Sequence, residues 1–296
     1  CTQDCYSGRL DPMIISIASG KGGTGKTTVA TNLAVSVSGP VQLLDCDVEE
    51  PNAHLFLRPS IQETKTVTTP VPEIDLEKCT QCKKCAEICR FRAIAVLGDT
   101  VLTFPELCHS CGGCMAVCPE GAITETGREL GVLEAGAMNG VAFVHGRLRV
   151  GEAMSPPLIR AVRDRTWADG LTLIDAPPGT SCPVIAAMKD TDFVLLVTEP
   201  TPFGLHDLKL AVEAVKILDI PMGLVINRAD VGDDKVRDYA HAEGLPILME
   251  IPYDRQIAES YSRGEMFALA LPEWKARFRE LIEKIETMTG KGAGTQ

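Results

Sequence analysis

The chain has 296 residues, of which 45% are apolar, and a formal net charge of -11. This length allows one large α/β domain and one small one, and the acidic balance argues against nucleic acid or a stable membrane anchor, since both need clustered Lys and Arg. No apolar run of about 18 residues and no signal-like start occurs, and eight of the twelve cysteines form two matching clusters, so we expect a cytoplasmic metal-binding protein.

Residues 1–12 show no apolar periodicity, and we interpret them as a leader or tag before a natural start at the methionine that follows. Cys1 and Cys5 would belong to this leader, with an extra metal or redox pair as the alternative. The apolar run Met13–Ala18 predicts a buried strand. The helical spacing of Thr27–Val37 predicts a helix after a glycine-rich turn.

The turn between this strand and helix matches the phosphate-binding pattern G-x-x-x-x-G-K-T. In such a loop, backbone N–H groups curl around phosphate oxygens. The lysine, here Lys26, binds the β- and γ-phosphates, and the threonine, here Thr27, ligates magnesium. The expected nucleotide contacts are Gly20, Lys21, Gly22, Gly23, Thr24, Gly25, Lys26, Thr27 and Thr28.

The α/β pattern breaks after a second apolar strand, Val41–Leu44. Residues 64–71 are rich in Thr, Val and Pro, and residues 72–126 contain an internal repeat with a constant offset of 29 residues. We interpret residues 72–126 as an inserted domain.

Each half of this repeat has the cysteine spacing C-x2-C-x2-C-x3-C of bacterial ferredoxins that hold two four-iron four-sulfur clusters. There, three cysteines of one run and the last cysteine of the other bind each cluster. The predicted sets are Cys79, Cys82, Cys85 and Cys118 for one cluster, and Cys108, Cys111, Cys114 and Cys89 for the other. Structural zinc is the alternative, but it needs one set of four ligands and not two interlocked sets.

One residue departs from the ferredoxin pattern, because Arg90 stands where a proline is expected after Cys89. Proline is not a ligand, so cluster assembly should survive. A cation here could raise a cluster's reduction potential, bind an acidic partner or remain a solvated surface residue. We expect His109, next to the second run, to be exposed and not a ligand.

After the glycine-rich stretch 127–151, apolar strands alternate with helical stretches, as in a parallel sheet covered on both faces. The expected strands are Leu171–Ile174, Phe193–Thr198, Met222–Ile226 and Ile247–Ile251. The last helix, Glu273–Met288, has one apolar face. We expect it to pack on the sheet, with a membrane-targeting helix as the alternative.

Together these patterns predict an α/β fold: a parallel-sheet P-loop NTPase domain with a small α+β ferredoxin-like insert. Residues 13–71 would form the first part of the NTPase domain, residues 72–126 the insert, and residues 127–290 the second part. Residues 1–12 and 291–296 would be a leader and a flexible tail.

A second lysine just inside the glycine-rich loop, Lys21, resembles the deviant Walker A motif of the MinD, ParA, Mrp and nitrogenase iron protein superfamily. The resemblance covers most of residues 13–290 outside the insert. It implies a dimer that sandwiches the nucleotide, with Lys21 reaching the partner's phosphates and assisting Lys26 in catalysis. A homodimer and a heterodimer with a related chain both remain open.

Other positions also resemble this superfamily. Asp47 is similar to the switch I aspartate that orients or deprotonates the attacking water. Asp175 is similar to the Walker B aspartate that holds magnesium through water, and Gly179 lies in a stretch that resembles switch II. Asn227 is similar to the residue that reads adenine, with Pro252 beside the ring, which favours ATP over GTP.

Two further cysteines lie near these positions. Cys182 follows Asp175 by seven residues, an offset that resembles the switch II cysteine of the nitrogenase iron protein. That protein's shared cluster needs two cysteines per subunit, and no second one lies between Cys118 and Cys182. We therefore interpret Cys182 as a buried apolar residue, and Cys46 as a packed one.

Three functions are compatible with these features. In the first, an ATPase couples its nucleotide state to electron transfer through the two clusters toward an unknown redox partner protein. In the second, the chain assembles or delivers iron-sulfur clusters, although the C-terminal C-x-x-C of Mrp-type proteins is absent. In the third, it is a MinD-like positioning or regulatory switch with a redox-sensing ferredoxin domain.

Overall fold

A nine-stranded sheet forms the centre of the computed structural model, which describes residues 12–291. Its order is β11-β10-β9-β1-β8-β2-β7-β6-β3. All neighbours from β11 to β7 are parallel, whereas β6 and β3 join antiparallel. The strands are β1 (Met13–Ala18), β2 (Val41–Asp45), β3 (Ser60–Ile74), β6 (Ile123–Met138), β7 (Val141–Leu148), β8 (Leu171–Asp175), β9 (Phe193–Thr198), β10 (Met222–Asn227) and β11 (Ile247–Ile251). The predicted α/β class is confirmed.

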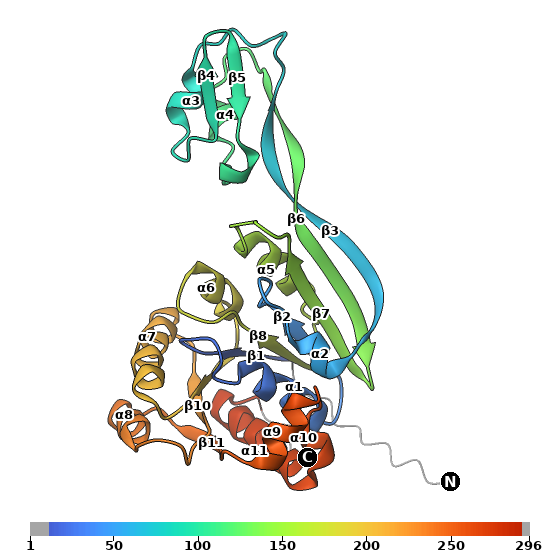
Figure 1. Ribbon diagram of the computed structural model, residues 1–296, viewed down its shortest axis with the longest axis vertical. Helices are drawn as coiled ribbons and strands as arrows, with labels where there is room; N and C mark the ends of the chain where they lie inside the picture. The colour runs from blue at the N-terminus through green and yellow to red at the C-terminus, as the bar shows by residue number, and fades with distance from the viewer. Residues whose placement is uncertain (1–11, 292–296) are drawn as a thin grey trace.

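Helices cover both faces of this sheet (Figure 1). One face is packed by α1 (Lys26–Ser36), α2 (Ala53–Leu57), α9 (Arg255–Ser262), α10 (Phe267–Ala270) and α11 (Pro272–Thr289). The other face is packed by α5 (Pro156–Arg163), α6 (Cys182–Met188), α7 (Pro202–Leu218) and α8 (Lys235–Glu243). Because both faces are buried, the central strands read as continuous apolar runs.

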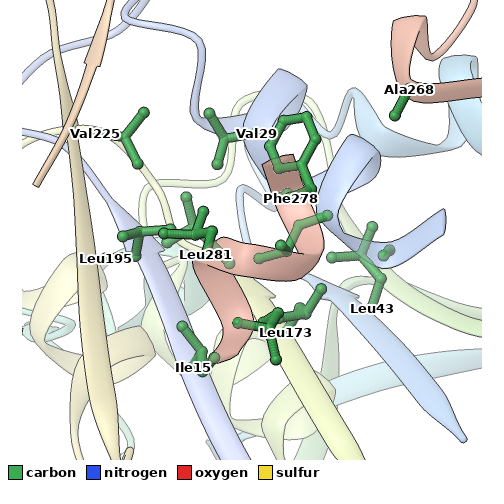
Figure 2. Close-up of a cluster of buried hydrophobic side chains, with 14 of the residues drawn as sticks. Ile15, Val29, Leu43, Leu173, Leu195, Val225, Ala268, Phe278 and Leu281 are labelled. Carbon is green, nitrogen blue, oxygen red and sulfur yellow. The ribbon is translucent and has the colours of Figure 1, made fainter. Parts of the chain in front are cut away.

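The terminal helix α11 packs on the sheet, as its apolar face predicted. Phe278 and Leu281 are fully buried and lie against side chains from the central strands and Val29 of α1 (Figure 2). Each such side chain contributes about 1.5–3 kcal/mol on burial. Within residues 12–291, no helix is both long and apolar enough to cross a membrane.

The glycine-rich stretch 127–151 forms most of β6 and all of β7, strands that the sequence did not suggest. Two glycines of this stretch allow neighbouring strands to approach closely. A Cβ on Gly131 would lie 2.3 Å from the carbonyl oxygen of Arg147, and one on Gly136 would lie 2.2 Å from that of Ser60. Glycine inside a strand thus marks close backbone approach here and not a turn.

Strands β3 and β6 continue beyond the sheet as a two-stranded ribbon. Within the sheet, Asp45 of β2 pairs with His145 of β7, which pairs with Glu134 of β6. Strand β7 ends at Leu148, whereas β3 and β6 pair for a further stretch up to Ile74. The ribbon therefore projects past the carboxyl edge of the parallel strands, which is also the edge that carries the glycine-rich loop.

The segment between the two ribbon strands is small and has its own core. It contains α3 (Lys84–Ile88), β4 (Ile94–Leu97), β5 (Thr100–Thr103), the short 3-10 helix Pro105–Leu107 and α4 (Gly113–Ala116). Strands β4 and β5 form an antiparallel pair, and Ile94 and Ile123 lie in the small core. Figure 1 shows this segment at the far end of the ribbon from the nine-stranded sheet.

Candidate functional site

The glycine-rich loop joins β1 to α1 and depends on two glycines for its shape. Gly23 and Gly25 have positive φ angles of 80° and 98°, which glycine adopts without steric cost. Gly20 is needed for space, because a Cβ there would lie 2.1 Å from the carbonyl oxygen of Asp207. Helix α1 begins at Lys26, so its free N–H groups face the loop.

A magnesium-type constellation lies beside this loop. The Thr27 hydroxyl donates to Oδ2 of Asp175 at 2.6 Å. The other oxygen of Asp175, Oδ1, is buried and has no hydrogen-bond partner among residues 12–291. Burial raises the pKa of Asp175, while the Lys26 ammonium and the Thr27 hydrogen bond act to lower it. A hydroxyl and an unpaired carboxylate oxygen are the hard oxygen donors that Mg²⁺ prefers.

Asp47 lines a cavity beside the glycine-rich loop, and the pKa of its carboxyl group is shifted. Burial raises its pKa to about 6, although Lys26 acts to lower it. The preceding Asp45 is fully buried and plays a different part: it accepts hydrogen bonds from the backbone N–H groups of Asp47, Asn52 and Ala53. Sequence reasoning did not assign this positioning role, which fixes the path of the chain after β2.

The loop and its neighbours line a cavity of about 460 Å³, within the usual size of small-ligand sites. The cavity lining includes these expected residues: Gly22, Gly23, Gly25, Lys26, Thr27, Thr28, Asp47, Asn227 and Pro252. Aromatic side chains that the sequence did not suggest also line it: Phe56, Tyr253 and Tyr261. They come from α2, from the loop after β11 and from α9, so no local motif could reveal them.

Other expected residues lie outside this lining, among them Gly20, Thr24, Asp175 and Gly179. Lys21 is outside as well, because its ammonium forms an ion pair with Glu199 of the same chain at 2.5 Å. Gly179 has a φ angle of 101°, and its N–H donates to the carbonyl oxygen of Ser19. The loop after β8 thus contacts the residue just before the glycine-rich loop.

Asn227 connects the end of β10 to the glycine-rich loop. Its Nδ2 donates to the carbonyl oxygen of Thr24 at 2.9 Å, and its Oδ1 accepts from the N–H of Arg228 at 3.0 Å. The amide is so close to Gly25 that a Cβ there would lie 2.5 Å from Nδ2. Asn227 therefore holds the loop in place, with one amide hydrogen left to face the cavity.

The eight cysteines of the small segment separate into two groups. Cys79, Cys82, Cys85 and Cys118 line one cavity, and Cys89, Cys108, Cys111 and Cys114 line another. Each group holds three cysteines of one run and the last cysteine of the other. Among residues 12–291, no three His, Cys, Asp or Glu side chains meet closely enough to bind a single metal ion.

The loops around the two cavities repeat one another in backbone conformation. At three places, residues that are 29 positions apart both have positive φ angles. The pairs are Gln81 and Ser110 (52° and 55°), Lys83 and Gly112 (66° and 70°), and Arg92 and Gly121 (55° and 59°). Non-glycine residues in this conformation are uncommon and cluster at functional sites.

Backbone N–H groups also point at sulfur atoms in both halves. The N–H of Ala93 donates to Sγ of Cys89, and that of Ala122 donates to Sγ of Cys118, each at 3.3 Å. Burial raises the pKa of the Cys85 and Cys114 thiols. N–H donors to sulfur are among the features that tune iron-sulfur centres.

The two remaining described cysteines have different environments. Cys46 is fully buried, and this burial raises the pKa of its thiol, so the expectation of a packed cysteine is confirmed. The expectation for Cys182 was wrong, because this residue is exposed at the first position of α6. Pro183 follows it and fixes the start of the helix, and the buried residues of α6 begin only with Val184. Cys1 and Cys5 lie outside the described residues.

Comparison with known proteins gives consistent results. The CbiA family model, described as the CobQ/CobB/MinD/ParA nucleotide binding domain, matches residues 15–267. An uncharacterized protein of Methanocaldococcus jannaschii is 30% identical over 260 residues, which cover 86% of this chain and 91% of the relative. An iron-sulfur cluster carrier protein of the same organism is 24% identical, covering 92% and 84%. The septum site-determining protein MinD of Pyrococcus horikoshii, solved with Mg-ADP, has a TM-score of 0.58 at 22% identity, covering 95% of this chain and 99% of its own.

Proposed function

Because this chain belongs to the CobQ/CobB/MinD/ParA family of nucleotide-binding domains, we propose that it is an ATPase that carries two four-iron four-sulfur clusters and uses its nucleotide state to control electron transfer through them. The observation that carries the proposal is the division of the eight cysteines into two crossed groups of four. A complete nucleotide site in the same chain supports the coupling.

The residues around the glycine-rich loop fit magnesium and ATP. Thr27 and the unpaired buried Oδ1 of Asp175 would hold the ion, which supplies charge neutralisation at the phosphates. Asp47 would accept a proton as water attacks the γ-phosphorus, the bond to the β–γ bridging oxygen breaks, and ADP and phosphate leave. Lys26, which is nearly buried, would stabilise the charge on the leaving phosphates.

Adenine would lie beside Pro252 and Tyr253. Both residues line the cavity, and an aromatic or proline ring can stack on a base. Asn227 has one amide hydrogen free of the bonds that hold the glycine-rich loop. A hydrogen-bond donor in this position would favour adenine over guanine if it faced N1, which is an acceptor in adenine and carries a hydrogen in guanine; the larger part of the affinity would come from the phosphates.

The cysteine groups fit four-iron four-sulfur clusters better than single ions. A single zinc needs four sulfurs at about 2.3 Å from one point, and the described side chains form no such single-ion group. Cys79, Cys82, Cys85 and Cys118 would hold one cluster, and Cys108, Cys111, Cys114 and Cys89 the other. Such clusters supply one-electron redox chemistry, and the left-handed loops and N–H donors of both halves would shape their surroundings.

A short path of contacts supports coupling between the two sites. The carbonyl oxygen of Val48, next to Asp47, accepts from the N–H of Leu148 at the end of β7. Gly146 of β7 leaves room for the Val48 side chain, since a Cβ there would lie 2.7 Å from it. Movement of the Asp47 segment on nucleotide binding would thus press on the β6–β7 hairpin, whose strand β6 continues into the ribbon.

We further propose a dimer, either of identical chains or with a related chain. Lys21 is 28% exposed at its side chain and is held by Glu199 beside the loop. Exchange of this partner for the phosphates of a facing subunit would place a second ammonium on the nucleotide. The ion pair within one chain would then be the resting arrangement of Lys21.

Delivery of clusters to other proteins is a second candidate function. It is favoured by the relatives that are named iron-sulfur cluster carrier proteins, at 24–26% identity. One cysteine of each group, Cys82 and Cys111, is exposed, so both clusters would be open to an acceptor. A carrier would lose its iron to an acceptor protein, whereas an electron-transfer protein would keep it.

The deciding experiment is anaerobic. Protein reconstituted with iron and sulfide is reduced with dithionite, freed of excess dithionite and mixed with an electron acceptor, with and without MgATP, and the cluster spectrum, iron content and phosphate release are followed together. Faster cluster oxidation with ATP, at constant iron content, is the expected result, and Lys26→Ala should abolish the ATP effect but not the clusters. Iron loss to an apo-ferredoxin would favour delivery, and hydrolysis without any change at the clusters would refute the coupling.

A further inference from the structure

The two halves of the cysteine repeat differ sharply in charge. Residues 78–92 contain five basic residues and one acidic residue, whereas the equivalent residues 107–121 contain no Lys or Arg and one acidic residue. The basic residues are Lys78, Lys83, Lys84, Arg90 and Arg92. A local net charge of +4 within a chain of net charge -11 is a strong asymmetry.

Two of these cations occupy backbone positions that glycine would fill more easily. Lys83 and Arg92 have φ angles of 66° and 55°, and the second half has Gly112 and Gly121 at the equivalent places. A side chain in this conformation costs about 1 kcal/mol relative to glycine. The first half therefore carries a conformational cost at two positions that hold a positive charge.

These cations are free for an outside partner. Lys83, Lys84, Arg90 and Arg92 are exposed and form no ion pair with any residue from 12 to 291. Helix α3, which begins at Lys84, lies on the side of the small segment that faces away from the ribbon (Figure 1). An approaching protein would meet this side without obstruction from the sheet.

Apolar residues alternate with the cations along the chain and lie beside the second cysteine cavity. Ile88 and Phe91 are 46% and 42% exposed, large values for apolar residues, and both line the cavity of Cys89 and its three companions. The ring of Phe91 stacks on that of His109, with centroids 3.6 Å apart. A basic surface with an apolar centre, next to a redox site, matches the anatomy of protein interfaces.

We propose that the surface formed by Lys83, Lys84, Ile88, Arg90, Phe91 and Arg92 binds an acidic electron-transfer protein and brings its redox group to the cluster held by Cys108, Cys111, Cys114 and Cys89. This inference rests on the proposed function. One electron would pass between the partner and that cluster, so that one is oxidised as the other is reduced. Local charge would select the partner, because the rest of the chain repels acidic proteins.

The experiment measures the rate at which an acidic flavodoxin, in its fully reduced form, reduces the clusters under anaerobic conditions. For the unmodified protein the rate should fall as salt rises from about 0.05 to 0.5 M, because screening weakens attraction between opposite charges. If net charge governed the encounter, the rate would rise with salt, since both proteins are acidic overall. A reduction rate that rises with salt would overturn the proposal.

Variants with matched charge changes locate the effect. Arg90→Gln with Arg92→Gly should slow reduction at low salt about tenfold. Lys216→Gln with Lys235→Gln removes the same charge from the exposed surface of the large domain, and should change the rate less than twofold. Reduction by dithionite, a small donor, should be equal in all forms. Equal flavodoxin rates in both variants would refute this surface.

Three further measurements distinguish an acidic protein partner from a membrane, from a second copy of this chain and from a failure of the proposed function: vesicle binding, self-association and iron content. Binding of the unmodified protein, but not of the Arg90–Arg92 variant, to phosphatidylserine vesicles would assign the surface to membranes and overturn the proposal. Self-association lost in that variant would assign it to a second copy, with the same consequence. Absence of iron after reconstitution would instead refute the proposed function, and is visible before any partner is added.

Discussion

A buried ion pair at the base of the ribbon gives the sharpest test of how the small segment is attached. Arg128 of β6 lies where the ribbon leaves the sheet, and its guanidinium donates through both terminal nitrogens to Glu152, which follows β7. Their side chains are only 8% and 1% exposed. Arg128→Leu would leave the Glu152 carboxylate buried without this partner.

The expected loss follows from burial. Removing one member of a buried pair costs about 3–5 kcal/mol. Arg149, 3.8 Å away and 45% exposed, and the N–H of Met154 would still face the Glu152 carboxylate, so the lower end applies. With about 2–4 °C per kcal/mol in domains of this size, the melting temperature should fall by roughly 6–12 °C. Differential scanning calorimetry on the reconstituted protein at pH 7.5 measures this directly.

The pH dependence has a definite sign. Burial acts to raise the pKa of Glu152, but the bonds from Arg128 and Met154 hold it below its ordinary value. In the unmodified protein, the ionised Glu152 therefore stabilises the fold fully above the ordinary pKa of Glu. This stabilisation is lost only as the pH falls through the lowered pKa of Glu152. In Arg128→Leu the pKa of Glu152 rises, so lower pH protonates Glu152 and removes the cost of a buried unpaired carboxylate. The difference in melting temperature between this variant and the unmodified protein should therefore narrow between pH 7.5 and 5.5.

The control is the double variant Arg128→Leu with Glu152→Leu. Replacing both charges by apolar groups is often neutral or stabilising, so this protein should melt within about 3 °C of the unmodified one. Two results would refute this reasoning. One is equal melting temperatures of the single and double variants at pH 7.5, and the other is a difference between Arg128→Leu and the unmodified protein that does not depend on pH. Either would mean that the charges of Arg128 and Glu152 do not stabilise the base of the ribbon.

Three other outcomes are expected. Asp47→Asn should lower the ATPase rate by about 10²–10⁴-fold, and in the unmodified protein the rate should fall below about pH 6, where Asp47 becomes protonated; a flat pH profile would contradict the assignment. Cys118→Ser should damage the cluster shared with Cys79, whereas Cys89→Ser should damage the other, so electron paramagnetic resonance should show two different surviving signals; identical spectra would exclude crossed ligation. Lys21→Ala should leave ATP binding to one chain within about threefold but abolish ATP-dependent dimerisation in analytical ultracentrifugation, and loss of ATP binding itself would mean that Lys21 acts within one chain.

Much of the fold and of the candidate sites could be predicted from short stretches of the sequence. The glycine-rich loop with Lys26 and Thr27 is a motif of eight consecutive residues, so it can be recognised locally, although Asn227 and Asp207 also contact it in the fold. The cysteine spacing is also local, because the three cysteines of each run that are separated by two residues lie at one cavity, and only the fourth lies at the other. The apolar strands and the terminal helix were also predictable, since burial on both sheet faces gives a continuous apolar run and burial on one helix face gives an apolar residue every three or four positions.

The residue types of the candidate sites are readable from the sequence, through the glycine-rich motif and the two cysteine runs. Their arrangement required the tertiary structure, which shows that β6 and β7 are strands despite their glycines, that Asp45 holds the Asp47 segment, and that Cys182 is exposed. The two strands depend on pairing with β2 and β3, which lie far away in the chain, and the Asp45 bonds depend on the path of the chain after β2. Such contacts leave no periodicity for a local pattern to reveal.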